Sequence, residues 1–207
     1  MDRLTVTVDT NNLAPREVAR LEAAASGLPI EFAHVTVSDR EMEGFEPQLA
    51  PAQILETGVW GESRWGEAVW GGPDGTASSS IPEAFVLGES RLDEAALAGD
   101  GESDRFERLL SLISRGTFPR AGSRDTLTKG QRRHLRDAMI VSGHLREGRD
   151  ILISDDWTRT PSLLPAVRDL ITNEFPNIRI MTAQEFVAYC ASLRQRTPPG
   201  CSREPAG

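Results

Sequence analysis

Apolar and polar side chains alternate near the start of the chain and predict a β-strand over residues 4–9. Leu4, Val6 and Val8 alternate with two threonines, and Asp9 closes the run. A period of two places alternate side chains on opposite faces of a sheet. This segment is therefore expected to be the first strand of the fold.

The rest of the chain divides into further strands and helices that follow one another in alternation. Apolar periodicity predicts strands over 30–37, 151–153 and 178–181, and helices over 15–25, 103–115, 162–173 and 183–193 together with one that carries Asp137. Strands that alternate with helices favour a parallel sheet covered by helices on both faces. We therefore expect an α/β fold with three layers, α/β/α, and a central parallel sheet.

Three helix starts are expected from their capping residues. Ser38 with Glu41 and Thr128 with Gln131 have the spacing of a capping box, in which each side chain satisfies a backbone amide of the first turn. Thr182 is the expected cap of the last helix. Glu41 could therefore be only a helix-start residue.

A segment of different composition interrupts this pattern and divides the chain. Residues 45–102 are rich in glycine, serine, proline and acidic residues and form an expected insertion, between a domain at 1–44 and 103–193 and a disordered tail at 194–207. Within the insertion, 59–72 and 86–99 repeat one another. The repeat could form a small hairpin-like pair that packs on itself or on the domain. It could also form a docking surface for a protein partner through Trp60–Trp70.

Composition excludes several classes of protein. The net charge of −8 argues against a protein that coats nucleic acid all over, although a local basic groove remains compatible with it. Two cysteines cannot build a disulfide framework or a zinc site. No signal peptide and no run of membrane-spanning length are found, so a cytoplasmic protein without a membrane partner is expected.

Acidic side chains follow two of the predicted strands and lie on one predicted helix. Asp9 ends the first strand, Asp155 and Asp156 follow the strand at 151–153, and Asp137 lies on the helix before it. Ligands of open α/β sheets bind at the carboxyl ends of the strands. Converging carboxylates would repel one another and raise their own pKa values unless a cation lay between them. Convergence would therefore indicate a hard divalent cation.

The order of these elements and of their acids resembles the PIN domain, a family of metal-dependent nucleases, over roughly residues 4–44 and 103–192. The motifs are Asp9-Thr10-Asn11, Ser38-Asp39-Arg40-Glu41, Asp137 with Ile140, and the run from Gly148 to Asp156, in which Ser154 and Asp156 match the family; Phe186 also fits. The long segment between Phe45 and Asp104 departs from compact members of the family. Asp39, Glu41 and Glu43 all remain candidates for the second acid.

The resemblance implies a metal-dependent endoribonuclease that hydrolyses phosphodiester bonds of single-stranded RNA, and it makes a homodimer plausible. Oxygen ligands alone select Mg²⁺ or Mn²⁺. Asp9, Asp137 and Asp156 would hold the metal, and Glu41 would complete the catalytic set or position water. Asn11, Ser154 and Asp155 would fix the rotamers of these carboxylates.

Each acid also has an ordinary structural explanation when it is considered alone. Asp9 could be a helix cap, Asp137 could form an ion pair with Arg133 one helical turn before it, and Asp156 could be a turn residue. The four acids taken together, in the order of the family, favour the site.

A cluster of basic residues precedes the third acid. Arg124, Lys129, Arg132, Arg133 and Arg136 could form a cationic strip that contacts nucleic acid, or only a solvated helix face. His134 and His144 are expected at the surface rather than as general bases.

Two other functions are considered beside the nuclease. A catalytically inactive PIN-like domain could bind RNA or protein through its aromatic insertion, because a fold does not settle a function. A phosphatase-like hydrolase with Asp9 as nucleophile would need an acid at position 11 and a catalytic lysine, but position 11 is Asn11 and the only lysine is Lys129.

Overall fold

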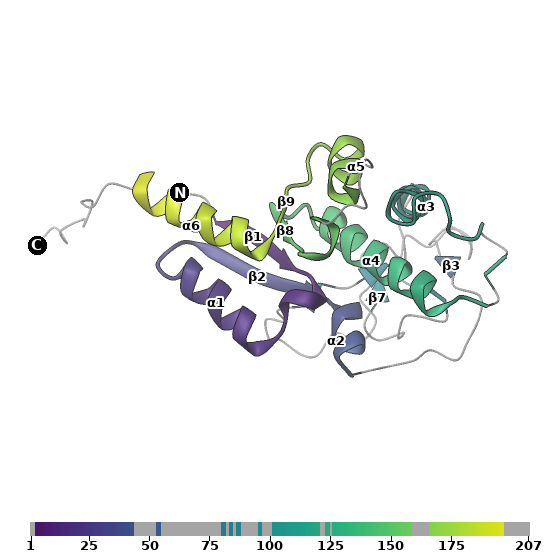
Figure 1. Ribbon diagram of the computed structural model, residues 1–207, viewed down its shortest axis with the longest axis horizontal. Coiled ribbons are helices and arrows are strands. Elements are labelled where there is room, and N and C mark those ends of the chain that lie inside the picture. Colours follow the sequence, from purple (N-terminus) through teal and green to yellow (C-terminus); the bar gives the residue numbers. More distant parts are fainter. Residues whose placement is uncertain are drawn as a thin grey trace, which may run out of the picture.

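A five-stranded parallel sheet forms the centre of the protein, shown as a computed structural model in Figure 1. The strands are β1 (Leu4–Val8), β2 (Ile30–Val35), β4 (Ser80–Ile81), β8 (Ile151–Ile153) and β9 (Ile180–Met181), in the order β4-β2-β1-β8-β9. Every pair of neighbouring strands is parallel. The structure describes residues 3–43, 53–54, 80–81, 83–84, 86–87, 95–96, 101–120, 123–124, 126–158 and 166–196. The prediction of an α/β fold with a parallel sheet is confirmed.

The strand β8 shows that the sheet is buried on both faces. Successive side chains of a strand point to opposite faces, yet Ile151, Leu152 and Ile153 are all fully buried. Leu152 belongs to one hydrophobic cluster, whereas Ile151 and Ile153 belong to another. The sequence of this strand is a continuous apolar run, which is the pattern expected for a central strand of a parallel sheet.

Two helices cover one face of the sheet. The helices α1 (Pro15–Ala25) and α6 (Ala183–Arg196) pack against each other, and Figure 1 shows them beside β1 and β2. Leu21 of α1 and Phe186 of α6 are buried with Val6, Val8 and the isoleucines of β8. The apolar stripe of each helix is thereby removed from water, which is the main stabilising contribution of this layer.

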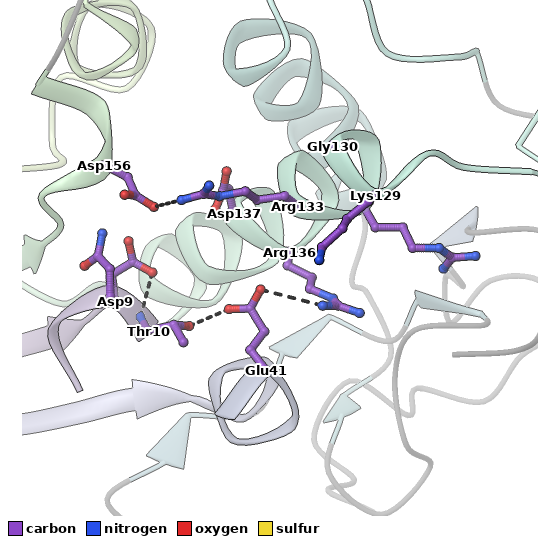
Figure 2. Close-up of a pocket in the computed structure, with 11 residues that line it drawn as sticks. Asp9, Thr10, Glu41, Lys129, Gly130, Arg133, Arg136, Asp137 and Asp156 are labelled. Carbon is purple, nitrogen blue, oxygen red and sulfur yellow. Dashed lines mark hydrogen bonds and ion pairs between the residues drawn. The ribbon is translucent and has the colours of Figure 1, made fainter. Parts of the chain in front are cut away.

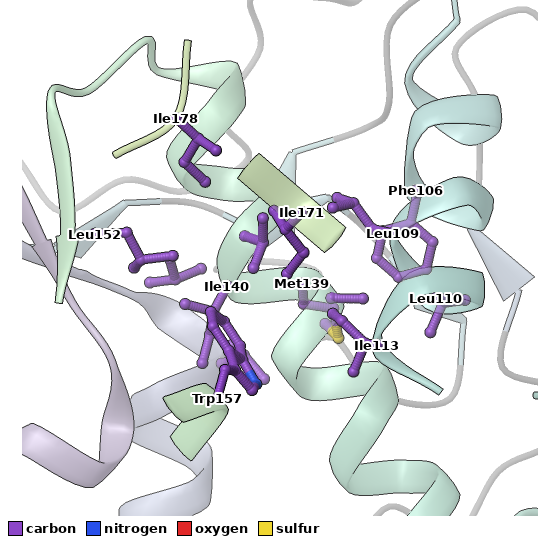
Figure 3. Packing of buried hydrophobic residues seen from close by; sticks show 14 of the residues in the cluster. Phe106, Leu109, Leu110, Ile113, Met139, Ile140, Leu152, Trp157, Ile171 and Ile178 are labelled. Atoms are coloured by element: carbon purple, nitrogen blue, oxygen red, sulfur yellow. The ribbon is translucent and has the colours of Figure 1, made fainter. Parts of the chain in front are cut away.

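Three further helices lie on the other face. The helix α4 (Lys129–Arg146) contacts β2, α3 (Glu102–Ile113) packs along α4, and α5 (Val167–Glu174) contacts α3. Figure 3 shows Phe106 and Leu109 of α3 and Met139 and Ile140 of α4 in the same cluster as Leu152 and Trp157. Full burial of one such side chain contributes about 1.5–3 kcal/mol. This layer therefore holds α4, with Asp137, firmly against the sheet.

Several predicted element boundaries are confirmed. The helix at 15–25 and the strand at 151–153 have the predicted bounds. Gln131 N donates to Thr128 Oγ1 at 3.2 Å and Thr128 N donates to Gln131 Oε1 at 2.8 Å, so the predicted capping box opens α4. Thr182 caps α6 in the same way, with Glu185 as its partner.

Other predicted boundaries are wrong. The second strand ends at Val35, and α2 (Thr36–Glu43) begins at Thr36, so Ser38 lies inside the helix and does not cap it. The helix expected over 162–173 begins at Val167, because Ala166 is extended, with φ −59° and ψ 147°. A proline at 165 explains the late start, since proline disfavours helix at the residue before it. The last helix continues to Arg196, three residues into the expected tail.

The predicted insertion is described only at short strands. Its β4 joins the central sheet beside β2, so the segment 45–102 contributes an edge strand to the domain. Two small sheets pair β3 (Gln53–Ile54) with β6 (Val86–Leu87), antiparallel, and β5 (Glu83–Ala84) with β7 (Ala95–Ala96), parallel. The first repeat at 59–72, with Trp60–Trp70, lies outside the described residues. Of the second repeat at 86–99, only 86–87 and 95–96 are described, and residues 197–207 also lie outside the described part of the chain.

Within the described part of the chain, no helix has the length and apolar character needed to cross a membrane.

Candidate active site

A pocket of about 520 Å³ opens where β1 and β8 end, and four carboxylates line it (Figure 2). Each comes from a different element: Asp9 follows β1, Glu41 lies on α2, Asp137 on α4, and Asp156 begins the short 3₁₀ helix Asp156–Thr158 after β8. Parallel neighbouring strands place their carboxyl ends at one edge of the sheet, so residues far apart in the sequence meet there. The structure thus brings together all four acids that the sequence singles out as catalytic.

Asp9 is the most buried of the four, with 3 % of its surface exposed. Ser154 Oγ donates to Asp9 Oδ2 at 2.6 Å, and the backbone N–H of Thr10 donates to Oδ1 at 2.7 Å. Burial raises the pKa of Asp9 from 3.8 to about 6, and the charges of Asp156 and Glu41 add to this effect, although the two hydrogen bonds oppose it. The orientation of Asp9 is therefore fixed while its ionised form is left short of positive charge.

The negative charge of Asp137 is the least compensated of the four by hydrogen bonds or ion pairs. It has no hydrogen-bond or salt-bridge partner among the residues that the structure describes, apart from those of its helical backbone. Burial raises the pKa of Asp137 well above 3.8, and the charges of Asp9, Glu41 and Asp156 raise it further. The positive charge of Arg133 lowers it only in part. The predicted alternative, an ordinary ion pair with Arg133, is wrong, because Arg133 donates to Asp156 instead.

Glu41 is the second acid that faces the pocket. Thr10 Oγ1 donates to Glu41 Oε2 at 2.6 Å, and the hydroxyls of Thr10 and Ser38 are 2.8 Å apart. The competing Asp39 does not line the pocket, and its Oδ1 lies 2.7 Å from His34 Nε2. The side chain of Glu43 lies outside the described residues. The geometry therefore favours Glu41 over Asp39.

The three residues expected to fix the carboxylate rotamers have different positions. Ser154 contacts Asp9 as expected. Asn11 lines the pocket but is exposed and bonds to none of the four described carboxylates. Asp155 is directed away from the pocket: its Oδ1 accepts from Ala183 N at 3.0 Å and its Oδ2 from Asn12 Nδ2 at 2.8 Å. The prediction for Asp155 is wrong, because this side chain connects the start of α6 to the turn after β1.

Two of the orienting residues were not predicted as such from the sequence. Thr10 contacts two of the four carboxylates, through its N–H and through its hydroxyl. Asn12, with 1 % of its surface exposed, holds the loop after β1 through Asp155. The position of Thr10 directly after a strand-ending acid is a signal that the sequence does contain.

Basic side chains form one rim of the pocket. Lys129, Arg133, Arg136 and Asp137 are spaced i, i+4, i+7 and i+8, so they lie on one face of α4. Arg133 donates to Asp156 Oδ2 at 2.8 Å, and Arg136 Nη1 lies 3.9 Å from Glu41 Oε1. Figure 2 shows Lys129 extending from the start of α4 into the same space. Arg132 also lines the pocket.

Arg124 does not belong to this rim, and the prediction that it contacts nucleic acid is wrong. Only 2 % of its surface is exposed. Its guanidinium donates to both carboxylate oxygens of Glu107, at 2.8 and 2.6 Å, and its Nε donates to Pro119 O at 2.9 Å. A buried guanidinium held in this way ties a loop to α3 and is not accessible to a phosphate.

The two histidines of α4 do not line the pocket. His144 is buried, with Nδ1 2.9 Å from Thr7 Oγ1, so the prediction of a surface position is wrong for this residue. Burial lowers the pKa of His144 to about 4. His134 is half-buried, and burial lowers its pKa as well. Both histidines are neutral at physiological pH.

The donor set of the pocket fits a hard divalent cation. All four acids offer oxygen atoms, which Mg²⁺ and Mn²⁺ prefer. The raised pKa values of Asp9 and Asp137 show that the negative charge is under-compensated. Among the described residues, no three His, Cys, Asp or Glu side chains already have the arrangement of metal ligands. Binding of an ion would therefore require the carboxylates to adjust around it.

Comparisons of the chain with known protein families, with curated proteins and with solved structures found no match. The functional argument therefore rests on the geometry and chemistry of this pocket.

Proposed function

We propose that the protein is a Mg²⁺- or Mn²⁺-dependent endoribonuclease that hydrolyses phosphodiester bonds of single-stranded RNA. One observation carries the proposal: Asp9, Glu41, Asp137 and Asp156 reach one pocket from four separate elements. Carboxylates that repel one another cost stability, and groups perturbed in this way cluster at functional sites. Their concentration beside a basic rim matches a reaction on a polyanion.

A PIN-like arrangement of the domain is part of the proposal. The parallel sheet, the helices on both of its faces and the position of each acid at a strand end or on α2 and α4 support it. Under this proposal, 1–44 and 103–193 form the PIN-like nuclease domain and 45–102 is an insertion that lends β4 to the sheet.

The metal would be held by Asp9, Asp137 and Asp156. A bound divalent ion would supply an activated water and neutralise charge at the leaving oxygen. Ser154 and the N–H of Thr10 keep Asp9 in one rotamer, so this ligand is oriented in advance. Glu41, which is held by the hydroxyl of Thr10, would accept a hydrogen bond from the attacking water.

The basic rim would hold the substrate. Lys129, Arg132, Arg133 and Arg136 offer several donors along one side of the acidic pocket. Phosphate contacts of this kind make binding dependent on salt and largely independent of sequence. The chain as a whole carries a net charge of −8, so attraction of RNA would depend on local basic surfaces such as this rim.

The test is cleavage of a mixed-sequence single-stranded RNA with Mn²⁺, using wild type, Asp9→Asn and Asp137→Asn. Asp169→Asn is the matched control, because Asp169 is an exposed acid in the first turn of α5, away from the pocket. We expect each pocket variant to lose activity by about 100-fold or more, because even outer contacts of metal sites cost 10- to 100-fold. The control should keep the wild-type rate. Equal rates in all four proteins would refute the proposed site.

The alternative is a PIN-like domain that binds RNA or protein without cleaving it, with its aromatic insertion as a further surface. The ion pairs of Asp156 with Arg133 and of Glu41 with Arg136 favour it, because they neutralise two of the four acids without a metal. In that case wild type would bind RNA equally well with Mn²⁺ or with a chelator and would not cleave it. The asparagine variants would then bind RNA as well as wild type or better, since each removes a negative charge beside the rim.

A further inference from the structure

Arg133 and Asp156 form an ion pair at the mouth of the pocket, and this pair involves one of the proposed metal ligands. Arg133 Nη2 donates to Asp156 Oδ2 at 2.8 Å, and their side chains are 65 % and 32 % exposed. Figure 2 shows the guanidinium reaching Asp156 across the pocket. A guanidinium in this place has the same sign of charge as a divalent ion on Asp156. The two cations therefore compete for one carboxylate.

The exposure of Arg133 distinguishes it from Arg136, which also pairs with a carboxylate of the pocket. Arg136 is only 16 % exposed and lies 3.9 Å from Glu41, whereas Arg133 is mostly exposed and reaches Asp156 with its terminal nitrogen. An exposed ion pair is weak, because water screens it and the long side chain loses freedom in forming it. A divalent ion can therefore displace Arg133 from Asp156 at small cost.

We propose that Arg133 is an internal counter-ion, which occupies Asp156 when no metal is bound and which moves to a phosphate of the RNA when a divalent ion takes its place. This inference rests on the proposed function. Once released, the guanidinium remains on the face of α4 that also carries Lys129 and lines the pocket. It can then offer a planar pair of N–H donors, which suits a phosphate.

The exchange couples the two ligands of the site. Metal binding frees a phosphate donor, and phosphate binding to Arg133 removes a competitor from Asp156. Each ligand must therefore strengthen the binding of the other by the same factor. Metal-free protein would hold RNA more weakly than metal-bound protein, since one of its rim arginines is engaged with an acid.

The test measures Mn²⁺ binding by isothermal titration calorimetry without RNA. Arg133→Gln should bind Mn²⁺ about fivefold more tightly than wild type, which is the upper end of the effect of one exposed ion pair. Arg133→Lys keeps the charge and should remain near wild type. Arg108→Gln is the matched control: Arg108 pairs with Glu174 at 2.8 Å with side-chain exposures of 61 % and 35 %, and neither residue lines the pocket. It should bind Mn²⁺ as wild type does.

A second measurement follows the phosphate side by fluorescence anisotropy of a labelled, short phosphorothioate RNA. Mn²⁺ should tighten the binding of this RNA to wild type. In Arg133→Gln the gain from Mn²⁺ should shrink, although this variant binds the metal itself more tightly. A purely structural role of Arg133 would not raise the affinity for Mn²⁺ and at the same time reduce the tightening of RNA binding by Mn²⁺.

The outcomes separate this inference from the proposed function. Mn²⁺ binding to wild type with equal or weaker binding to Arg133→Gln would overturn the counter-ion role and leave the nuclease intact. Absence of Mn²⁺ binding in every variant would overturn both. If Arg133→Gln binds Mn²⁺ more tightly but Mn²⁺ tightens its RNA binding as much as it does in wild type, Arg133 only competes with the metal for Asp156. That outcome would refute its transfer to phosphate.

Discussion

The substitution Asp9→Asn should stabilise the metal-free protein, although it should abolish activity. The pKa of Asp9 rises from 3.8 to about 6 in the folded state. Keeping this carboxylate ionised at neutral pH therefore costs about 3 kcal/mol of the free energy of unfolding, because each pH unit between the two values is worth about 1.4 kcal/mol. Asparagine has nearly the same shape and carries no charge.

The two hydrogen bonds of Asp9 do not reduce this gain. Asparagine can still accept from Thr10 N through its Oδ1, and its Nδ2 can donate to Ser154 Oγ, which now acts as an acceptor. The pKa of about 6 already includes the stabilisation of the ionised form by both hydrogen bonds, so no further loss is subtracted for them. We therefore expect a net gain of about 3 kcal/mol, or a rise in Tm of about 6–12 °C for a chain of this length.

The assay is thermal unfolding with a chelator between pH 4 and pH 8. A raised carboxylate pKa means that the unfolded state loses its proton first, so the stability of wild type falls as pH rises from about 4 to about 6. The advantage of Asp9→Asn should therefore be absent near pH 4, grow to pH 6 and stay constant above it. Asp169→Asn, which leaves the pocket unchanged, is the control for the substitution of an aspartate outside it. A variant that is less stable than wild type at pH 7.5, or whose advantage does not change with pH, would refute the reasoning.

Two further predictions concern buried groups outside the pocket. Arg124→Ala should lower the free energy of unfolding, measured in urea, by about 2 kcal/mol, because charged hydrogen bonds to Glu107 are lost. The affinity for RNA should stay unchanged. A loss of RNA affinity without a loss of stability would contradict the structural role of Arg124. His144→Asn should make stability less sensitive to acid. The pKa of His144 is about 4 in the folded protein, against 6.5 for the free side chain. As pH falls from 6.5 to 4 the unfolded state takes up a proton that the folded state does not, so wild type loses about 3 kcal/mol of its free energy of unfolding. The pH dependence of urea unfolding measures this, and identical slopes for wild type and variant would contradict it.

The sequence predicts much of the fold because the apolar pattern is strict in the elements that hold it. The run Ile151–Ile153 is apolar throughout, and such a run between charged residues has few alternatives to a buried strand. The acids that end β1 and β8 could be predicted to meet because parallel strands end at the same edge. The start of α2 could not be predicted, since Thr36 and Ser38 are both acceptable helix-start residues and only tertiary contacts choose between them.

The errors in the site arise where a charged side chain has a distant partner. Arg124 looks like its neighbours in the basic strip, but Glu107, seventeen positions before it, takes up its guanidinium. Asp155 and Asp156 are adjacent and chemically identical, yet Asp155 accepts a hydrogen bond from Ala183 N at the start of α6 and Asp156 faces the pocket. Periodicity does not distinguish two neighbours at the end of a strand, because a turn sets the direction of each side chain.

The position of β1 between β2 and β8 has a consequence for the synthesis of the chain. The hydrogen bond between Ser154 and Asp9 joins residues 145 positions apart, and β8 pairs with β1 over a similar distance. A growing chain can pair β1 with β2 early, but two of the four pocket acids, Asp137 and Asp156, emerge from the ribosome only with α4 and the residues after β8. Contacts so distant in sequence form late in folding. Chains that end before Asp156 therefore lack the assembled pocket, and any activity of the site would begin only after this residue has been made.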